Sequence, residues 1–202
     1  INSVPEVIQK IEAARAAGKP IDGHAPGLTG EALRKYAAAG ITTDHECASL
    51  EEAYEKIKHG MKILIRQGSA ARNLEDLLPL LSTNPHEVMF CTDDCHPDDL
   101  MRQHINEHVR TAVAKGYDLF DVIRAASVNP VIHYKLPVGL LREGDPADFL
   151  MVNSLETFEV QSVYLDGEKV WENRPLFSSS AILNPINSFY INSISEDDIK
   201  VS

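Results

Sequence analysis

The sequence predicts an α/β protein made of parallel strand–helix units, followed by a smaller β-rich part. Strand-like apolar runs start near positions 20, 41, 61 and 88, and a helical pattern follows each of them. The third run is almost continuously apolar, which is typical of strands buried on both faces of a parallel sheet. Since a closed eight-fold barrel needs roughly 250 residues and this chain has 202, we expect an incomplete barrel of about four βα units.

Local signals bound the elements of the first two units. Pro5 suits a first helical turn, Thr29 and Ser49 suit helix caps, and glycines at positions 18, 40 and 60 end the helical patterns. The predicted elements are a helix over 5–17, a strand over 19–24, a helix over 29–40, a strand over 41–46 and a helix over 49–60.

Similar local signals bound the elements of the next two units and of the β-rich part. Asn129-Pro130 is expected to end one helix, and Asp166-Gly167 predicts a β-hairpin turn. The predicted elements are strands over 61–69 and 86–94, helices over 73–81, 97–115 and 117–130, and short strands over 147–152 and 159–171.

A domain boundary is expected near residues 134–140. It separates a barrel part over 1–133 from a small β domain segment over 134–175. Residues 176–202 contain an Asn-Pro pair, serine clusters and an acidic stretch. We expect them to form a linker toward an absent C-terminal domain.

The charge balance excludes several function classes. Lysine and arginine number 19 against 30 aspartates and glutamates, so the formal net charge is −11. A nucleic acid or an anionic membrane surface would require a basic face, so we expect neither as a partner. The chain also has no apolar run of the roughly 20 residues that span a membrane, no basic leader and only three cysteines. A small neutral or cationic ligand and a cytoplasmic location are therefore expected.

Metal-ligand side chains follow three of the four predicted strands. His24 ends the first, His45 the second and Asp93 the fourth. Because the carboxyl ends of parallel strands meet at one edge, two imidazoles and a carboxylate would share a pocket suited to a divalent transition metal that activates water. A single histidine at a strand end is more often structural, but three equivalent positions favour a metal site.

Five segments then indicate a family. DGHAPGL, AAGITTDHE, IRQGSAARNLEDLLPL, FCTDD and HPDDL occur in this order, and together they resemble the adenine deaminases of the amidohydrolase superfamily over residues 4 to 172. The resemblance implies that residues 1–133 form the second half of a TIM-type barrel. It also implies that His24, His45 and Asp93 bind a divalent metal, with a binuclear manganese or iron centre favoured and zinc possible on chemical grounds.

The implied reaction is hydrolysis of adenine to hypoxanthine and ammonia. Activated water would attack C6, and Asp93 would take its proton and pass it to the leaving group. The family also uses a His-x-His pair and a glutamate that these 202 residues do not supply. We therefore expect an internal fragment that is inactive alone, from an enzyme that is a homo-oligomer.

Several residues keep two interpretations. Arg66 and Ser69 could contact a purine, or Arg66 could pair with Asp44 or Glu46; Asp94 could orient a ligand or be a plain loop carboxylate. The roles of His96 and His104 stay open. The remaining candidates are interpreted as structural or solvated: Cys91, Cys95, His59, His86, His108, His133, Glu51, Glu52 and Glu55.

Two other functions stay open. One is an amidohydrolase that acts on a cyclic amide or another amine. The other is a non-catalytic α/β module that retains the histidines without using them. Stoichiometric metal would separate the module from either enzyme.

Overall fold

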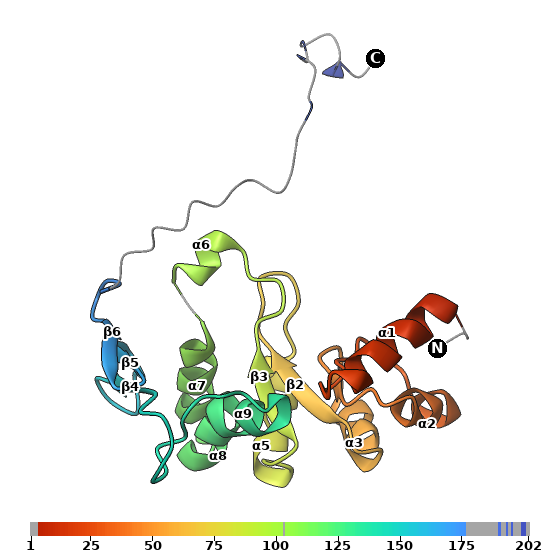
Figure 1. The fold of residues 1–202 in the computed structure, drawn as a ribbon, viewed down its shortest axis with the longest axis horizontal. Coiled ribbons are helices and arrows are strands. Elements are labelled where there is room, and N and C mark those ends of the chain that lie inside the picture. The colour runs from red at the N-terminus through yellow and green to blue at the C-terminus, as the bar shows by residue number, and fades with distance from the viewer. Residues whose placement is uncertain are drawn as a thin grey trace.

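The structure is a computed structural model that describes residues 4–102, 104–176, 190, 193, 195, 199 and 200 (Figure 1). The helices are α1 (Pro5–Ala16), α2 (Gly30–Ala38), α3 (Leu50–Lys58), α4 (Leu74–Leu77), α5 (Leu80–Thr83), α6 (Pro97–Leu100), α7 (Ile105–Ala114), α8 (Leu119–Ile123), the π-helical turn η1 (Arg124–Val128) and α9 (Asn129–Tyr134). The strands are β1 (Thr43–Asp44), β2 (Lys62–Arg66), β3 (Val88–Cys91), β4 (Phe149–Val152), β5 (Val160–Leu165) and β6 (Glu168–Trp171).

A parallel sheet with the order β1-β2-β3 organises the larger part of the molecule. Its register runs from Ile63 opposite Val88 to Arg66 opposite Cys91. Helices connect the strands, which confirms the predicted α/β class, and all three strands therefore end at the same edge. Whatever side chains follow them are brought together there.

The main core lies between this sheet and the helices that cover it. α3 and α4 pack on β2, while α7, η1 and α9 pack on β3. Fully buried apolar side chains from the strands and helices form one cluster, which includes Ile63, Ile65, Leu77, Val88 and Ala112. Burial of each large aliphatic side chain contributes about 1.5–3 kcal/mol, so the core fixes the strand ends firmly.

The strand predicted over 19–24 is not a strand in the structure, and this prediction is wrong. The backbone of this segment accepts one hydrogen bond from the residue before β1, in which Thr42 N–H donates to Ile21 O at 2.8 Å. The following N–H groups, which a ladder would need, donate instead to side chains. The acceptors for residues 23, 24 and 25 are Thr43 Oγ1, Tyr36 OH and Asp44 Oδ1.

Two predicted helices are each divided in the structure. The helix expected over 73–81 becomes α4 and α5, because Pro79 supplies no N–H for a continuous ladder. The helix expected over 97–115 becomes α6 and α7. The sequence pattern shows the apolar face but not these interruptions.

Asn129-Pro130 does not end its helix, contrary to the prediction. The chain passes through η1 into α9 and leaves the helix at Lys135, whose φ of 52° is left-handed. Asn129 is buried and donates to Pro85 O and Val88 O, both at 2.7 Å. These bonds anchor the helix to the start of β3, while Pro130 occupies the first turn of α9, where its missing N–H matters little.

The β-rich part is an antiparallel sheet with the order β4-β5-β6. Asp166 and Gly167 have φ values of 50° and 81°, so the predicted tight hairpin turn is confirmed. The Phe149 and Tyr164 rings stack between β4 and β5, with their centroids 4.5 Å apart. The boundary near 134–140 stays a prediction, and the linker predicted over 176–202 lies almost entirely outside the described residues.

Among the residues that the structure describes, no helix combines the length and the apolar character needed to cross a membrane.

The buried histidine on α7 generates a prediction about pH. His108 Nε2 lies 2.9 Å from Cys91 O, and burial lowers the pKa of the imidazole. Between the ordinary histidine pKa of about 6.5 and the lower folded value, the unfolded chain binds a proton that the folded chain refuses. We therefore expect the free energy of unfolding to fall as the pH drops below about 6.5.

Urea unfolding between about pH 7 and pH 5 checks this expectation. His108→Gln keeps a donor for Cys91 O but cannot titrate, so its stability should depend less on pH than that of the wild type. His59→Gln, at an exposed position, is the control. Equal pH dependence in the wild type and His108→Gln would contradict the prediction.

Candidate metal centre and active site

Polar side chains converge where the parallel strands end. His24 lies on the irregular segment before α2, His45 and Glu46 directly follow β1, Arg66 is the last residue of β2, and Asp93 lies two residues after β3. The parallel register places the ends of β1, β2 and β3 together, and with them His45, Glu46, Arg66 and Asp93. His24 reaches the same edge without a strand, through hydrogen bonds from residues 23–25 to Thr43, Tyr36 and Asp44. The result is a compact group of imidazoles, carboxylates and one guanidinium.

Two imidazoles and one carboxylate form the tightest part of this group. His24 Nδ1 lies 3.3 Å from His45 Nε2, and Glu46 Oε1 lies 3.5 Å and 3.4 Å from these two atoms. Ligands about 2.1 Å from a tetrahedral metal are separated by about 3.4 Å. The three atoms therefore fit three vertices around one divalent cation, and the donor set suits zinc, manganese or iron.

Asp93 lies at the margin of this triangle. Its Oδ2 is 3.9 Å from His45 Nε2, and its backbone φ of 53° is left-handed. This conformation is uncommon for a residue other than glycine, although aspartate tolerates it better than most, and such residues cluster at functional sites. In this geometry Glu46, which the sequence marks only as a strand-end carboxylate and a possible Arg66 partner, lies nearer the two histidines than Asp93 does.

Arg66 links the two carboxylates. Its Nη1 donates to Glu46 Oε1 and, at 2.5 Å, to Asp93 Oδ2, while Nη2 donates to Glu46 Oε2 at 3.1 Å. Burial opposes the charge, but the bonds to Glu46 and Asp93 outweigh it and raise the pKa of Arg66. Arg66 is therefore a fixed cation whose two terminal nitrogens already have carboxylate partners.

Asn73 is a site residue that the sequence does not reveal. Its Oδ1 accepts from Arg66 N–H at 2.6 Å, and its Nδ2 donates to Cys47 O at 3.0 Å and to His45 O at 3.3 Å. It thus joins the end of β2 to the loop after β1. The only signal in the sequence is an asparagine as the first residue of the helix predicted over 73–81, a position where asparagine normally indicates a cap.

A second charged cluster lies beneath the histidines, and it corrects the prediction that Glu52 is solvated. Lys56 Nζ is buried and donates to Glu52 Oε1 at 2.6 Å and to Asp44 Oδ2 at 2.9 Å. Burial alone would raise the pKa of Asp44 and lower that of Lys56. The hydrogen bond and attraction between Asp44 and Lys56 outweigh burial for both groups, and the bond from Lys56 to Glu52 further favours the charged lysine. The pKa of Asp44 is therefore lowered and that of Lys56 is raised, so both groups stay charged.

Cys47 completes this cluster without being reactive. Its Sγ donates to Asp44 Oδ2 at 3.2 Å, and burial raises the pKa of the thiol. Asp44, Cys47 and Glu52 are close enough to suggest a metal group. However, the Lys56 ammonium already supplies the cation between the two carboxylates, so the cluster is complete as a salt bridge.

Ser69 and Asp94 lie in a neighbouring pair of loops. Ser69 Oγ donates to Asp99 Oδ2 at 2.5 Å and accepts from His96 N–H at 2.8 Å, while Ser69 N–H donates to Asp94 O at 3.0 Å. A Cβ at Gly68 would lie 2.3 Å from Thr92 O, so only glycine permits this approach. These contacts tie the loop after β2 to the loop that carries Asp93.

The other residues with open roles lie at helix starts. His96 immediately precedes α6 and His104 immediately precedes α7. Cys91 and Cys95 are free thiols.

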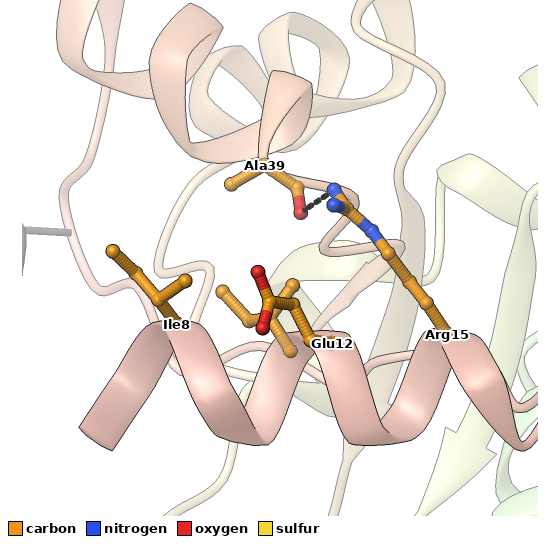
Figure 2. A pocket seen from close by; sticks show the side chains of 5 residues that line it. Ile8, Glu12, Arg15 and Ala39 are labelled. Atoms are coloured by element: carbon orange, nitrogen blue, oxygen red, sulfur yellow. Dashed lines mark hydrogen bonds between the residues drawn. The ribbon is translucent and has the colours of Figure 1, made fainter. Parts of the chain in front are cut away.

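A shallow hollow elsewhere, between α1 and the end of α2, holds none of these side chains (Figure 2). It is lined by Ile8, Ile11, Glu12, Arg15 and Ala39, and Arg15 donates to Ala39 O.

Comparison with known proteins gives one family match. The amidohydrolase family profile matches residues 1–170. The chain is 55% identical over 199 residues to an adenine deaminase of Sulfurovum sp. (strain NBC37-1), which covers 98% of this chain and 37% of that protein. It is 51% identical to an adenine deaminase of Salinibacter ruber, over 100% of this chain and 37% of the relative. The chain thus spans little more than a third of these relatives.

The fold also resembles solved structures. A beta-aspartyl dipeptidase of Fervidobacterium islandicum AW-1 superposes with a TM-score of 0.65 at 19% identity, over 86% of this chain and 52% of that one. An N-acetyl-D-glucosamine-6-phosphate deacetylase of Mycobacterium smegmatis gives a TM-score of 0.59 at 16% identity, over 80% and 54%. At these identities the likeness concerns the fold alone.

The histidine geometry predicts metal-dependent stability. Added Mn²⁺ should raise the unfolding temperature of the wild type, since a ligand at 100 times its dissociation constant stabilises by about 2.7 kcal/mol. His45→Ala removes a central donor and should abolish most of this gain. Differential scanning fluorimetry with and without Mn²⁺ measures it, with the exposed His59→Ala as the control. An equal gain in His45→Ala would show that the metal binds elsewhere.

Proposed function

Because the chain belongs to the amidohydrolase family, we propose that it forms part of a metal-dependent adenine deaminase, which hydrolyses adenine to hypoxanthine and ammonia. The main support is the convergence of His24, His45, Glu46 and Asp93 at one strand edge. The high identity to adenine deaminases over nearly the whole chain favours adenine among possible substrates.

His24, His45 and Asp93 would hold the metal, with Glu46 as a further donor beside them. Neutral imidazoles and carboxylates are the ligands that a catalytic divalent ion uses, and the spacing of the His24, His45 and Glu46 donors fits one ion, with Asp93 Oδ2 3.9 Å from His45 Nε2. Such an ion, when bound, lowers the pKa of water to about 7. We propose manganese or iron, in a binuclear centre, from the family resemblance.

Asp93 would carry the proton. Its carboxylate is partly exposed beside His45, where it can accept the proton that water loses as its oxygen bonds to C6 of adenine. The same proton then passes to the amino nitrogen, the C6–N bond breaks and ammonia leaves. The bond from Arg66 Nη1 to Asp93 Oδ2 fixes the carboxylate in one orientation.

Of the three residues proposed to contact the purine, Asp94 is the most available. Its side chain is exposed next to Asp93, whereas Ser69 is bonded to Asp99 and Arg66 is buried between two carboxylates. We therefore propose that Asp94 accepts a hydrogen bond from the purine. Arg66 would act by orienting Glu46 and Asp93, and Ser69 by joining the two loops.

Residues 1–133 would supply the second half of a TIM-type barrel, and residues 134–175 part of a small β domain. The parallel order β1-β2-β3 with intervening helices supports the first proposal, and the antiparallel sheet β4-β5-β6 supports the second. The resemblance assigns the family's His-x-His pair and its glutamate to no residue of this chain, which contains no His-x-His pair. We propose that the complete enzyme supplies them and assembles as a homo-oligomer.

Replacing the proposed proton carrier tests the reaction. In the complete enzyme with Mn²⁺ or Fe²⁺, Asp93→Asn should lower kcat for adenine by about 10²–10⁴-fold, the usual contribution of a general acid–base group. Ammonia release and hypoxanthine formation measure it. Asp98→Asn, at an exposed position on α6, is the matched control. Wild-type hydrolysis of cyclic amides in preference to adenine would overturn the assignment.

The isolated chain should be inactive. Purified residues 1–202 should release no ammonia from adenine with either metal, because half of the proposed ligand set is missing. Robust turnover by this chain would refute the proposal that the remaining ligands are needed.

A further inference from the structure

We propose that Lys56 is a positioning residue that sets the spacing of His24 and His45, an inference that rests on the proposed metal-dependent function. Lys56 contacts neither imidazole. It lies on α3, fully buried, below the two segments that carry the histidines. Lys56 would act on the histidines through its hydrogen bonds to the Asp44 and Glu52 carboxylates and to the Ala25 carbonyl.

The ammonium has a complete set of partners. Its three protons match three acceptors, which are Glu52 Oε1 at 2.6 Å, Ala25 O at 2.6 Å and Asp44 Oδ2 at 2.9 Å. Glu52 lies one turn earlier on α3, Asp44 ends β1, and Ala25 follows His24. One cation therefore joins a helix, a strand end and a loop.

The backbone of the segment that carries His24 is held through both a carbonyl oxygen and N–H groups. Ala25 O accepts from Lys56, and Ala25 N–H donates to Asp44 Oδ1 at 2.8 Å. Further along, Gly27 N–H donates to Glu52 Oε1 at 2.8 Å. The His24 side chain is 68% exposed, so its place depends on these backbone bonds rather than on packing.

The segment of His45 depends on the same two carboxylates. Asp44 immediately precedes His45, and its Oδ2 accepts from Glu46 N–H at 3.1 Å. Glu52 Oε2 accepts from Ala48 N–H at 3.1 Å. Both histidine segments thus bond to Asp44 and Glu52, and the single Lys56 ammonium lies between these two carboxylates and donates to each of them.

Loss of the ammonium would disturb both segments together. Two buried carboxylates would face each other with no cation between them, an arrangement that like-charge repulsion and desolvation oppose. Separation of the carboxylates, or water entry, would shift residues 25–27 relative to residues 44–48. The 3.3 Å distance between His24 Nδ1 and His45 Nε2 is the quantity that would change.

Metal affinity distinguishes this role from a merely structural one. Lys56→Met fills a similar volume without charge, and Lys58→Met removes an exposed lysine from the same helix as the control. In the complete enzyme, titrated with Co²⁺ and followed by its visible absorption, Lys56→Met should bind about 10- to 100-fold more weakly, as substitution of outer partners of metal ligands does. Lys58→Met should match the wild type.

A folded Lys56→Met, verified by circular dichroism, that binds Co²⁺ with wild-type affinity and spectrum overturns the proposal. If Lys56→Met fails to fold, Glu52→Gln decides. It keeps an acceptor for Gly27 but removes one carboxylate charge and the acceptor for Ala48, so weaker Co²⁺ binding is expected and unchanged binding overturns the proposal. Adenine turnover is measured separately. A wild type that binds Co²⁺ but never deaminates adenine overturns the deaminase assignment, while the titration still decides the role of Lys56.

Discussion

The buried ammonium of Lys56 is the constraint on which the carboxyl edge of the parallel sheet depends. A charged group removed from water costs several kcal/mol unless its partners replace the solvent. Lys56 meets that condition with three oxygens, and each of the two carboxylates also accepts backbone N–H groups from the histidine segments. Because loss of the Lys56 ammonium would leave two buried carboxylates without their cation, the loops that follow β1 and precede α2 depend on it for their relative position.

A second cation, Arg66, organises the side of the site that faces solvent. It holds Glu46 and Asp93, while Asn73 fastens its backbone to the loop after β1. His45 therefore lies between two charge clusters, with Asp44 directed toward Lys56 and Glu46 toward Arg66. This arrangement holds the Glu46 and Asp93 carboxylates in place through hydrogen bonds to Arg66, and preorganised charges of this kind are what electrostatic catalysis uses.

Short-range signals predicted their elements well. Ser49 caps α3 by accepting from Glu52 N–H, and Asp166-Gly167 forms its hairpin, because in both cases the determining bonds lie within a few residues. Signals that compete with distant partners failed. Asn129-Pro130 continues a helix because Asn129 bonds to the start of β3. Glu52 is buried rather than solvated because Lys56 and the histidine segment bind it.

The sequence by itself determined the alternation of strands and helices from residue 41 onward and the placement of His45 and Asp93 just after strands, because periodicity and residue order are local properties. His24 follows no strand, and hydrogen bonds from its segment to Thr43, Tyr36 and Asp44 bring it to the same edge. Only the tertiary structure decided the partners: Glu46 beside the histidines, Arg66 between Glu46 and Asp93, and Lys56 between Asp44 and Glu52. The physical reason is that a charge pair forms where packing brings two groups within about 3 Å. Residues 44 and 56, or 66 and 93, meet only after the sheet and its helices have packed.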